Sequence, residues 1–215
     1  MSAVRPEFGP TLPELLGPRL RVLPRVVRLA LGAVAALVVL AALWALLLRG
    51  GGAGAPHGIV VHRPIAFNFI YARPFHKRAP LPGELARVGG NRQALAVREL
   101  RLPAYRGDAS AFLPFYAAKL EIQMGRQLPG FLWRADGKAN VNGVTGYEII
   151  FQYRPHGKLT FGRRVLLLPT STSRQGVDLL LTAPFTPAVG RADAVGRNGP
   201  LKTSLRSFRF GTQRP

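Results

Sequence analysis

The chain has 215 residues, a formal net charge of +20 and no cysteine. The lack of cysteine excludes disulfides, thiolate metal sites, cysteine nucleophiles and a lipid-modified cysteine anchor together. So basic a chain is expected to attract anionic partners. It contains no run of four or more basic residues, however, and scattered charge that serves only solubility is an equally good explanation.

One uncharged apolar stretch, residues 29–48, reads LALGAVAALVVLAALWALLL. At about 1.5 Å rise per residue, a helix of this length spans the roughly 30 Å core of a bilayer. Five arginines precede the stretch, whereas Arg49 alone follows it before a Gly/Ala run. The positive-inside rule therefore keeps the N-terminus in the cytoplasm. The sequence predicts a single-pass signal-anchor protein of a bacterial cell membrane, with its C-terminal domain outside.

Two alternatives compete with this anchor. A buried core helix is usually shorter and keeps a polar stripe, which this stretch lacks. A cleaved signal peptide would use Ala53-Gly54-Ala55 as its small-residue site. The apolar run is longer than the usual 7–15 residues, and Pro56 would follow the cut directly, so the uncleaved anchor is favoured.

The anchor divides the chain into five predicted parts. A basic cytoplasmic tail (1–28) and the transmembrane helix (29–48) are followed by a Gly/Ala tether (49–57), an extracytoplasmic domain (58–211) and a short C-terminal tail (212–215). From His57 onward, 24 Lys and Arg stand against 8 Asp and Glu. The outer part therefore carries most of the positive charge, and it is long enough for one domain with a core of its own.

The first half of this domain reads as strands, a long loop and a helix. Residues 59–62 and 65–71 predict short strands, and residues 94–102 alternate as a third. The segment between the second and third of these strands, residues 72–92, is rich in proline and basic residues and predicts a loop. Pro114 fits the first turn of a helix that ends near Leu128. Its apolar residues recur at every fourth position, which indicates packing on a sheet: Phe112, Tyr116, Leu120, Met124 and Leu128.

The second half contains the clearest pattern. Asn142-Gly143 predicts a tight hairpin, because both central residues of a type I′ turn need positive φ. Strands are predicted at residues 134–141, 144–153 and 158–168, and again at 177–183. Apolar residues on both faces of the middle strands indicate a sheet that is covered on both sides. Gly199-Pro200 opens a last helix. The expected fold class is α+β, an antiparallel sheet flanked by helices.

This order of elements resembles a known family. The N-terminal strand pair, the mid-chain helix, the NGVTGY hairpin of residues 142–147, the EIIF strand of residues 148–151 and the terminal helix are similar to the Mog1/PsbP-like α/β/α sandwich. The resemblance covers about residues 58–211 and includes single-pass actinobacterial proteins of that type. It implies a non-enzymatic binding or assembly factor, and it supplies no shared site residues.

No stretch carries a catalytic, cofactor or phosphate-loop motif. None of the four histidines has helical i, i+4 spacing with another, so no metal or cofactor is predicted. The main expectation is a non-catalytic binding or scaffold domain that contacts envelope proteins, anionic lipids or wall polymers. One alternative is an envelope enzyme whose site assembles from scattered acids, and another is a domain that closes around an apolar ligand. Nucleic acid suits the charge but not the predicted location.

Binding residues for an anionic partner are sought first in the predicted loop of residues 72–92. Long irregular loops are often functional, although a mobile solvated loop is the simpler explanation. A second basic group follows in the predicted strand of residues 158–168. The candidate residues are Arg73, His76, Lys77, Arg78, Arg87, Arg92, Arg163 and Arg164.

Overall fold

The computed structural model describes residues 24, 26–27, 34, 36–41, 57–90 and 92–213, and the chain divides into two units, residues 1–52 and 53–215. The predicted tail (1–28), transmembrane helix (29–48) and tether (49–57) lie largely outside the described residues, as do residues 214 and 215 of the C-terminal tail. Residues 36–41 are helical, and their apolar side chains are exposed. Among the residues that are described, no helix is both long and apolar enough to cross a bilayer. The anchor therefore stays a prediction.

The second unit is built on a seven-stranded antiparallel sheet with the order β3-β4-β5-β9-β8-β7-β6. A three-stranded sheet, β1-β2-β10, is separate from it. The strands of the large sheet are β3 (His76–Arg78), β4 (Glu84–Gly90), β5 (Gln93–Arg101), β6 (Leu132–Val141), β7 (Val144–Tyr153), β8 (Thr160–Leu167) and β9 (Gln175–Pro184). Those of the small sheet are β1 (His57–Val61), β2 (Phe67–Tyr71) and β10 (Arg209–Phe210).

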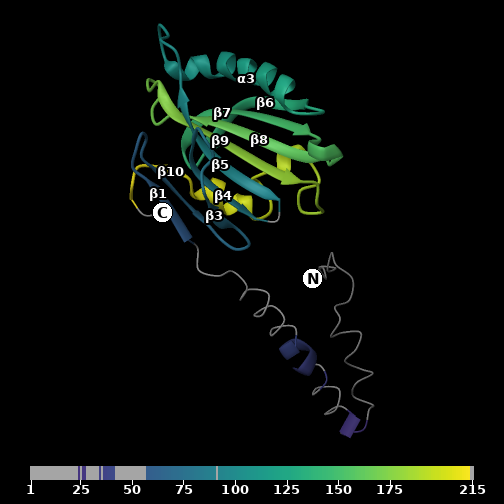
Figure 1. The fold of residues 1–215 in the computed structure, drawn as a ribbon. Coiled ribbons are helices and arrows are strands. Elements are labelled where there is room, and N and C mark those ends of the chain that lie inside the picture. Colours follow the sequence, from purple (N-terminus) through teal and green to yellow (C-terminus); the bar gives the residue numbers. More distant parts are fainter. Residues whose placement is uncertain are drawn as a thin grey trace, which may run out of the picture. The chain divides into compact units, whose positions relative to one another are not determined.

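Each face of the large sheet has its own core. Helix α3 (Leu113–Gln127) follows the short 3₁₀ turn η1 (Ala109–Phe112) and buries Leu113, Leu120 and Met124 against one face. The small sheet and helix α4 (Leu201–Ser207) cover the other face, where Phe67 and Phe208 pack on the central strands. Figure 1 shows α3 on one side of the sheet and β1, β10 and the yellow α4 on the other. The predicted α+β class and the two-sided cover are confirmed.

Both cores come only from residues between Ile59 and Phe208. Over the part of the chain that the structure describes, no residue outside 57–215 contributes a buried side chain to either core. Because residues 57–215 contain both cores in full, we expect them to fold without the rest of the chain.

The turn predictions hold at the level of single residues. Asn142 has φ 52° and Gly143 has φ 84°, so the β6–β7 hairpin has the two positive φ values that Asn-Gly favours. Pro114 lies in the first turn of α3, as the sequence predicts.

The prediction of a loop over residues 72–92 is wrong. Strands β3, of 3 residues, and β4, of 7 residues, lie within it, and β4 pairs with both β3 and β5. The apolar alternation of β4 is interrupted in the sequence, because one of its buried positions is Glu84, whose charge is compensated by Arg87 and Arg98. Gly89 and Gly90 then end the strand. Strand β10 was also missed, because two residues are too short to show a period.

At two glycines, one in β7 and one in β9, the backbone of the neighbouring strand segment approaches closely. A Cβ on Gly146 of β7 would lie 2.1 Å from the carbonyl oxygen of Leu166, and a Cβ on Gly176 of β9 would lie 2.1 Å from that of Leu167. These are backbone atoms, so a side chain at either position has to push the central strands apart. The small residue in the predicted NGVTGY hairpin is thus a packing requirement.

We expect Gly146→Ala to lower the free energy of unfolding of the domain by about 1–3 kcal/mol, the usual range for overpacking, or by more if the strands separate. Gly137→Ala is the matched control in the paired strand β6, where a Cβ meets nothing within 4 Å. Urea unfolding followed by circular dichroism measures both. Equal midpoints for the two variants would contradict the close approach.

Candidate functional site

One face of strands β6, β7 and β8 is only partly covered, although it belongs to the same side of the large sheet as α4. A short 3₁₀ turn, η3 (Ala192–Ala194), packs across β7 and β8 on this face. A hollow lies on each side of η3. Glu148 of the first hollow and Ile150 of the second are two residues apart in β7, so they point to the same face.

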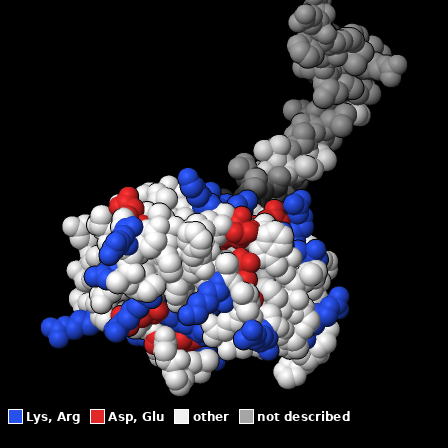
Figure 2. All heavy atoms as spheres, turned by 90° about the horizontal axis from the view of Figure 1, so that it is seen from above, with Lys and Arg blue, Asp and Glu red and all other residues white. Residues whose placement is uncertain are grey.

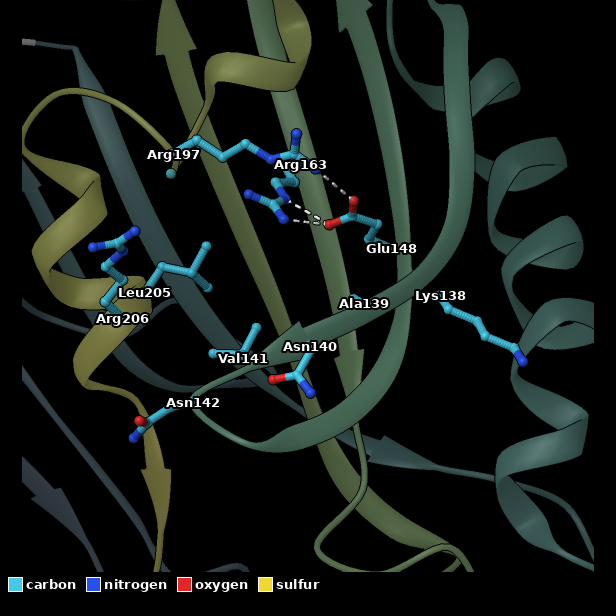
Figure 3. Close-up of a pocket in the computed structure, with 11 residues that line it drawn as sticks. Lys138, Ala139, Asn140, Val141, Asn142, Glu148, Arg163, Arg197, Leu205 and Arg206 are labelled. Carbon is cyan, nitrogen blue, oxygen red and sulfur yellow. Dashed lines mark hydrogen bonds and ion pairs between the residues drawn. The ribbon is translucent and has the colours of Figure 1, made fainter.

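The first hollow has a volume of about 610 Å³ and centres on Glu148. The Nε of Arg163 donates to Oε2 of Glu148 over 2.7 Å, and its Nη2 donates to the same oxygen. The Nη2 of Arg197 lies 3.5 Å from Oε1. Figure 3 shows both guanidinium groups converging on Glu148, with Arg206 of α4 across the hollow and Lys138 turned away toward α3.

Arg163 also fixes the segment that follows η3. Its Nη1 donates to the carbonyl oxygen of Val195 over 3.2 Å. The next residue, Gly196, has φ +73°, and a Cβ there would lie 2.8 Å from Leu205 and 2.9 Å from Leu181. The chain therefore passes close to the core and then turns out, which brings Arg197 to the open side of Glu148.

The second hollow, of about 660 Å³, lies at the other end of β6. Ile150, Leu159, Phe161 and Phe185 form apolar parts of its lining, and three arginines occur among its other residues. Arg134 donates from Nε and Nη2 to Oε1 of Gln152, at 3.0 and 2.8 Å. This amide oxygen orients the guanidinium without neutralising its charge.

Together the two hollows hold six arginines and two carboxylates, Glu148 and Asp193. Arg163 and Arg197 share Glu148, and Arg191 lies 3.2 Å from Asp193. Arg134, Arg154 and Arg206 have no carboxylate within 4 Å among the described residues. The face thus has an excess of positive charge in a concave place, where the field of separate charges adds up. We call it the arginine face.

Figure 2 shows Lys and Arg spread over one side of the domain in small groups, several of them beside acids. This agrees with the absence of basic runs in the sequence.

The candidate residues of the segment 72–92 come together along one edge of the large sheet. β3 is an edge strand, and His76, Lys77 and Arg78 are its three exposed residues. Arg73 and Arg92 are exposed in neighbouring turns, while Arg87 is paired with Glu84 at 2.9 Å. Charged edge strands prevent pairing with another chain, which is a structural explanation for this basic edge.

Arg163 and Arg164 are separated by the sheet. Consecutive strand residues point to opposite faces, so Arg164 lies on the α3 side, where its Nε donates to Asp178 over 2.8 Å. Both guanidinium groups are largely buried and paired, and they do not form one basic surface with β3. Glu148 is buried although it is charged, and Arg163 compensates its charge in the interior.

Sequence reasoning missed five of the six arginines of this face, namely Arg134, Arg154, Arg191, Arg197 and Arg206. They come from β6, the β7–β8 connection, the turns around η3, and α4. No local motif links them, so only the strand register and the path of η3 bring them together.

An acidic group lies on the α3 side, outside both hollows. The hydroxyl of Tyr147 donates to Asp136, and this bond is the main cause that raises the pKa of Tyr147 to about 12. Burial raises the pKa of Glu121, with Asp136 adding to the shift and Trp133 opposing it. Burial also raises the pKa of Tyr153 and, together with Asp178, that of Tyr116. None of these tyrosines or acids lines either hollow of the arginine face.

No family model and no curated protein matches the chain. Among solved structures, cyanobacterial PsbP from Synechocystis sp. PCC 6803 matches at 11% identity and a TM-score of 0.49, covering 75% of this chain and 95% of its own. LpqN of Mycobacterium tuberculosis, described as involved in cell envelope biogenesis, matches at 14% identity and 0.44, covering 74% and 92%. A Pseudomonas aeruginosa putative regulator of unknown function matches at 18% and 0.32, covering 63% and 85%.

These likenesses concern the fold alone. The arrangement that the Mog1/PsbP-like resemblance predicts is present in this chain, with α3 on one face of the antiparallel sheet and α4 on the other.

We expect Arg163→Met to lower the free energy of unfolding by about 3–5 kcal/mol, because it leaves the Glu148 carboxylate buried without its main partner. Arg197→Met is the matched control. The Arg197 side chain is 57% exposed, and we expect its loss to cost no more than about 1 kcal/mol. Urea unfolding tests both variants, and equal losses would show that Arg163 does not compensate Glu148.

We expect Asp136→Asn to lower the pKa of Tyr147 from about 12 toward the ordinary value near 10. A raised tyrosine pKa stabilises the fold fully below pH 10, and this contribution disappears as the pH rises toward 12. An ultraviolet titration of phenolate absorbance, with Tyr147→Phe to assign the step, measures the change. An unchanged titration in Asp136→Asn would exclude the hydrogen bond as its cause.

Proposed function

We propose that the chain is a membrane-anchored, extracytoplasmic binding domain that holds a phosphate-bearing envelope ligand on the arginine face, without chemical conversion. The observation that carries the proposal is the concentration of six arginines and two carboxylates in two adjoining hollows. Anionic lipid head groups and phosphate-containing wall polymers share the recognised group.

A ligand that carries several phosphate groups suits this face better than one small anion does. A guanidinium presents a planar fork of donors that matches phosphate oxygens. The three arginines that have no carboxylate partner among the described residues occur in both hollows, Arg206 in the first and Arg134 and Arg154 in the second. A ligand with several phosphates in a row, or a surface of head groups, can contact both groups at once.

The entry point of the chain supports a ligand close to the membrane. β1 begins at His57 and belongs to the layer that covers the same side of the large sheet as the arginine face. The predicted tether before it has few residues, and eight extended residues reach roughly 28 Å at most. A domain held on such a tether stays within reach of the head groups.

The exposed apolar helix supports the anchor itself. Leu37, Val38, Val39 and Leu40 are each more than half exposed in the described part of the first unit. Such side chains are stable where lipid covers them.

The non-catalytic part of the proposal rests on the content of the hollows. An enzyme that uses scattered acids would need titratable groups of shifted pKa together in one concavity. The described tyrosines and acids with shifted pKa values lie outside the arginine face.

We expect the domain of residues 57–215 to bind a labelled glycerol-phosphate oligomer, and to co-sediment with phosphatidylglycerol vesicles but not with neutral phosphatidylcholine vesicles. Both interactions should weaken steeply with salt, since they are electrostatic. Arg154→Ser/Arg206→Ser should reduce binding roughly tenfold or more, because each charge-assisted bond to phosphate contributes about 1.5–3 kcal/mol. Fluorescence anisotropy and sedimentation measure the two arms.

Lys119→Ser/Arg126→Ser is the matched control, because it also removes two positive charges and both residues are exposed on α3, on the opposite side of the sheet. It should bind like the unchanged domain. Binding of the oligomer alone would assign a polymer ligand, and binding of vesicles alone would assign head groups. Salt-insensitive absence of both would disprove the proposal, and equal losses in Lys119→Ser/Arg126→Ser and Arg154→Ser/Arg206→Ser would disprove the assignment to this face.

A further inference from the structure

The two hollows of the arginine face differ in their chemistry. Polar and charged residues dominate the first, including Asn140, Asn142 and the Glu148–Arg163 pair. The second has an apolar floor, formed by Ile150, Leu159 and Phe161, with Phe185 beside it. η3 stands between them. Charge alone does not require this apolar floor, which points to a ligand with a hydrocarbon part.

Phe185 is the exposed aromatic residue beside this floor. Its side chain is 58% exposed, although it follows directly on the end of β9. Its ring meets the buried ring of Phe161 in an edge contact, with 6.3 Å between the ring centroids. The backbone N–H of Phe185 donates to the carbonyl oxygen of Leu159 over 3.3 Å, which holds the main chain at Phe185 beside the hollow. A large apolar surface is thus held open to solvent next to cations.

The cations form the other part of this site. Arg134, Arg154 and Arg191 line the same hollow, with Asp193 as the one carboxylate among its lining residues. Arg134 and Arg154 have no carboxylate partner in the described chain. Its volume of about 660 Å³ falls within the roughly 300–1,000 Å³ of small-molecule sites.

We infer that the second hollow is a subsite for an anionic amphiphile, a phosphate ester whose alkyl chain lies on Phe161 and Phe185 while its phosphate meets Arg134 and Arg154. The inference deepens the proposed function and rests on it. It assigns to the ligand class a hydrocarbon chain joined directly to a phosphate, as in a lipid-linked anion. A wall polymer made only of polar units would leave the floor unoccupied.

Hexyl phosphate and methyl phosphate are the probes, because they carry the same phosphate and differ only in chain length. Isothermal titration of residues 57–215 should show hexyl phosphate binding at least about tenfold more tightly than methyl phosphate, since each methylene removed from water adds to affinity. Phe185→Ser should remove most of this difference. Its matched control is Phe115→Ser, which makes the same change at a 66% exposed ring on α3 and should leave the difference intact.

The possible results separate failure of the subsite from failure of the proposed function. Equal affinities for the two phosphates, while the glycerol-phosphate oligomer or anionic vesicles still bind, would overturn the subsite and leave the proposed function standing. Absence of binding by every phosphate-bearing probe would overturn both. A chain-length effect that Phe185→Ser and Phe115→Ser reduce equally would show non-specific adsorption and would also overturn the subsite. Loss in Phe185→Ser alone, with an unchanged circular dichroism spectrum, would establish it.

Discussion

The buried ion pair of Arg163 and Glu148 organises the face on which the proposed function depends. The two residues lie diagonally across β7 and β8, and the same guanidinium donates to the carbonyl oxygen of Val195 beyond η3. The pair therefore connects two central strands with the segment that crosses them. It acts together with the burial of Ala192 and Val195 in the core, which also holds η3 on the sheet. A buried ion pair adds little net stability against apolar residues of the same size, so its effect here is on geometry.

A second ion pair repeats this arrangement on the opposite face. Arg164 and Asp178 also lie diagonally, across β8 and β9, and they are covered from the α3 side. Two adjacent arginines of β8 are thus each paired with an acid, one on each face of the large sheet. A shift of the β8 register by one residue would place each guanidinium on the wrong side, away from its carboxylate. The two pairs specify the register of the central strands more strictly than the alternation of Leu and Val does.

The sequence allowed the elements to be predicted wherever a period or a turn residue was present. The alternation of β7, the helix with Pro114 in its first turn and the Asn142-Gly143 turn were all readable locally. Strand β4 was not, because Glu84 occupies a buried position and its partner Arg98 comes from the next strand. The arginine face was not readable either, because Arg134, Arg163 and Arg206 are far apart along the chain. Only the candidate Arg163 belongs to it, and its role there is internal.

The domain has two basic surfaces, and their shapes separate their roles. Along β3 the charges stand on a projecting sheet edge, where solvent screens each of them and where they discourage pairing with another chain. On the arginine face the cations surround hollows with a low-dielectric floor, in which a bound anion loses water and meets several donors together. In the proposed function, positive charge thus has two roles: it discourages strand pairing at the edge, and it binds the anionic ligand in the hollows. The inferred subsite beside Phe185 would add a selectivity for hydrocarbon that charge alone does not provide.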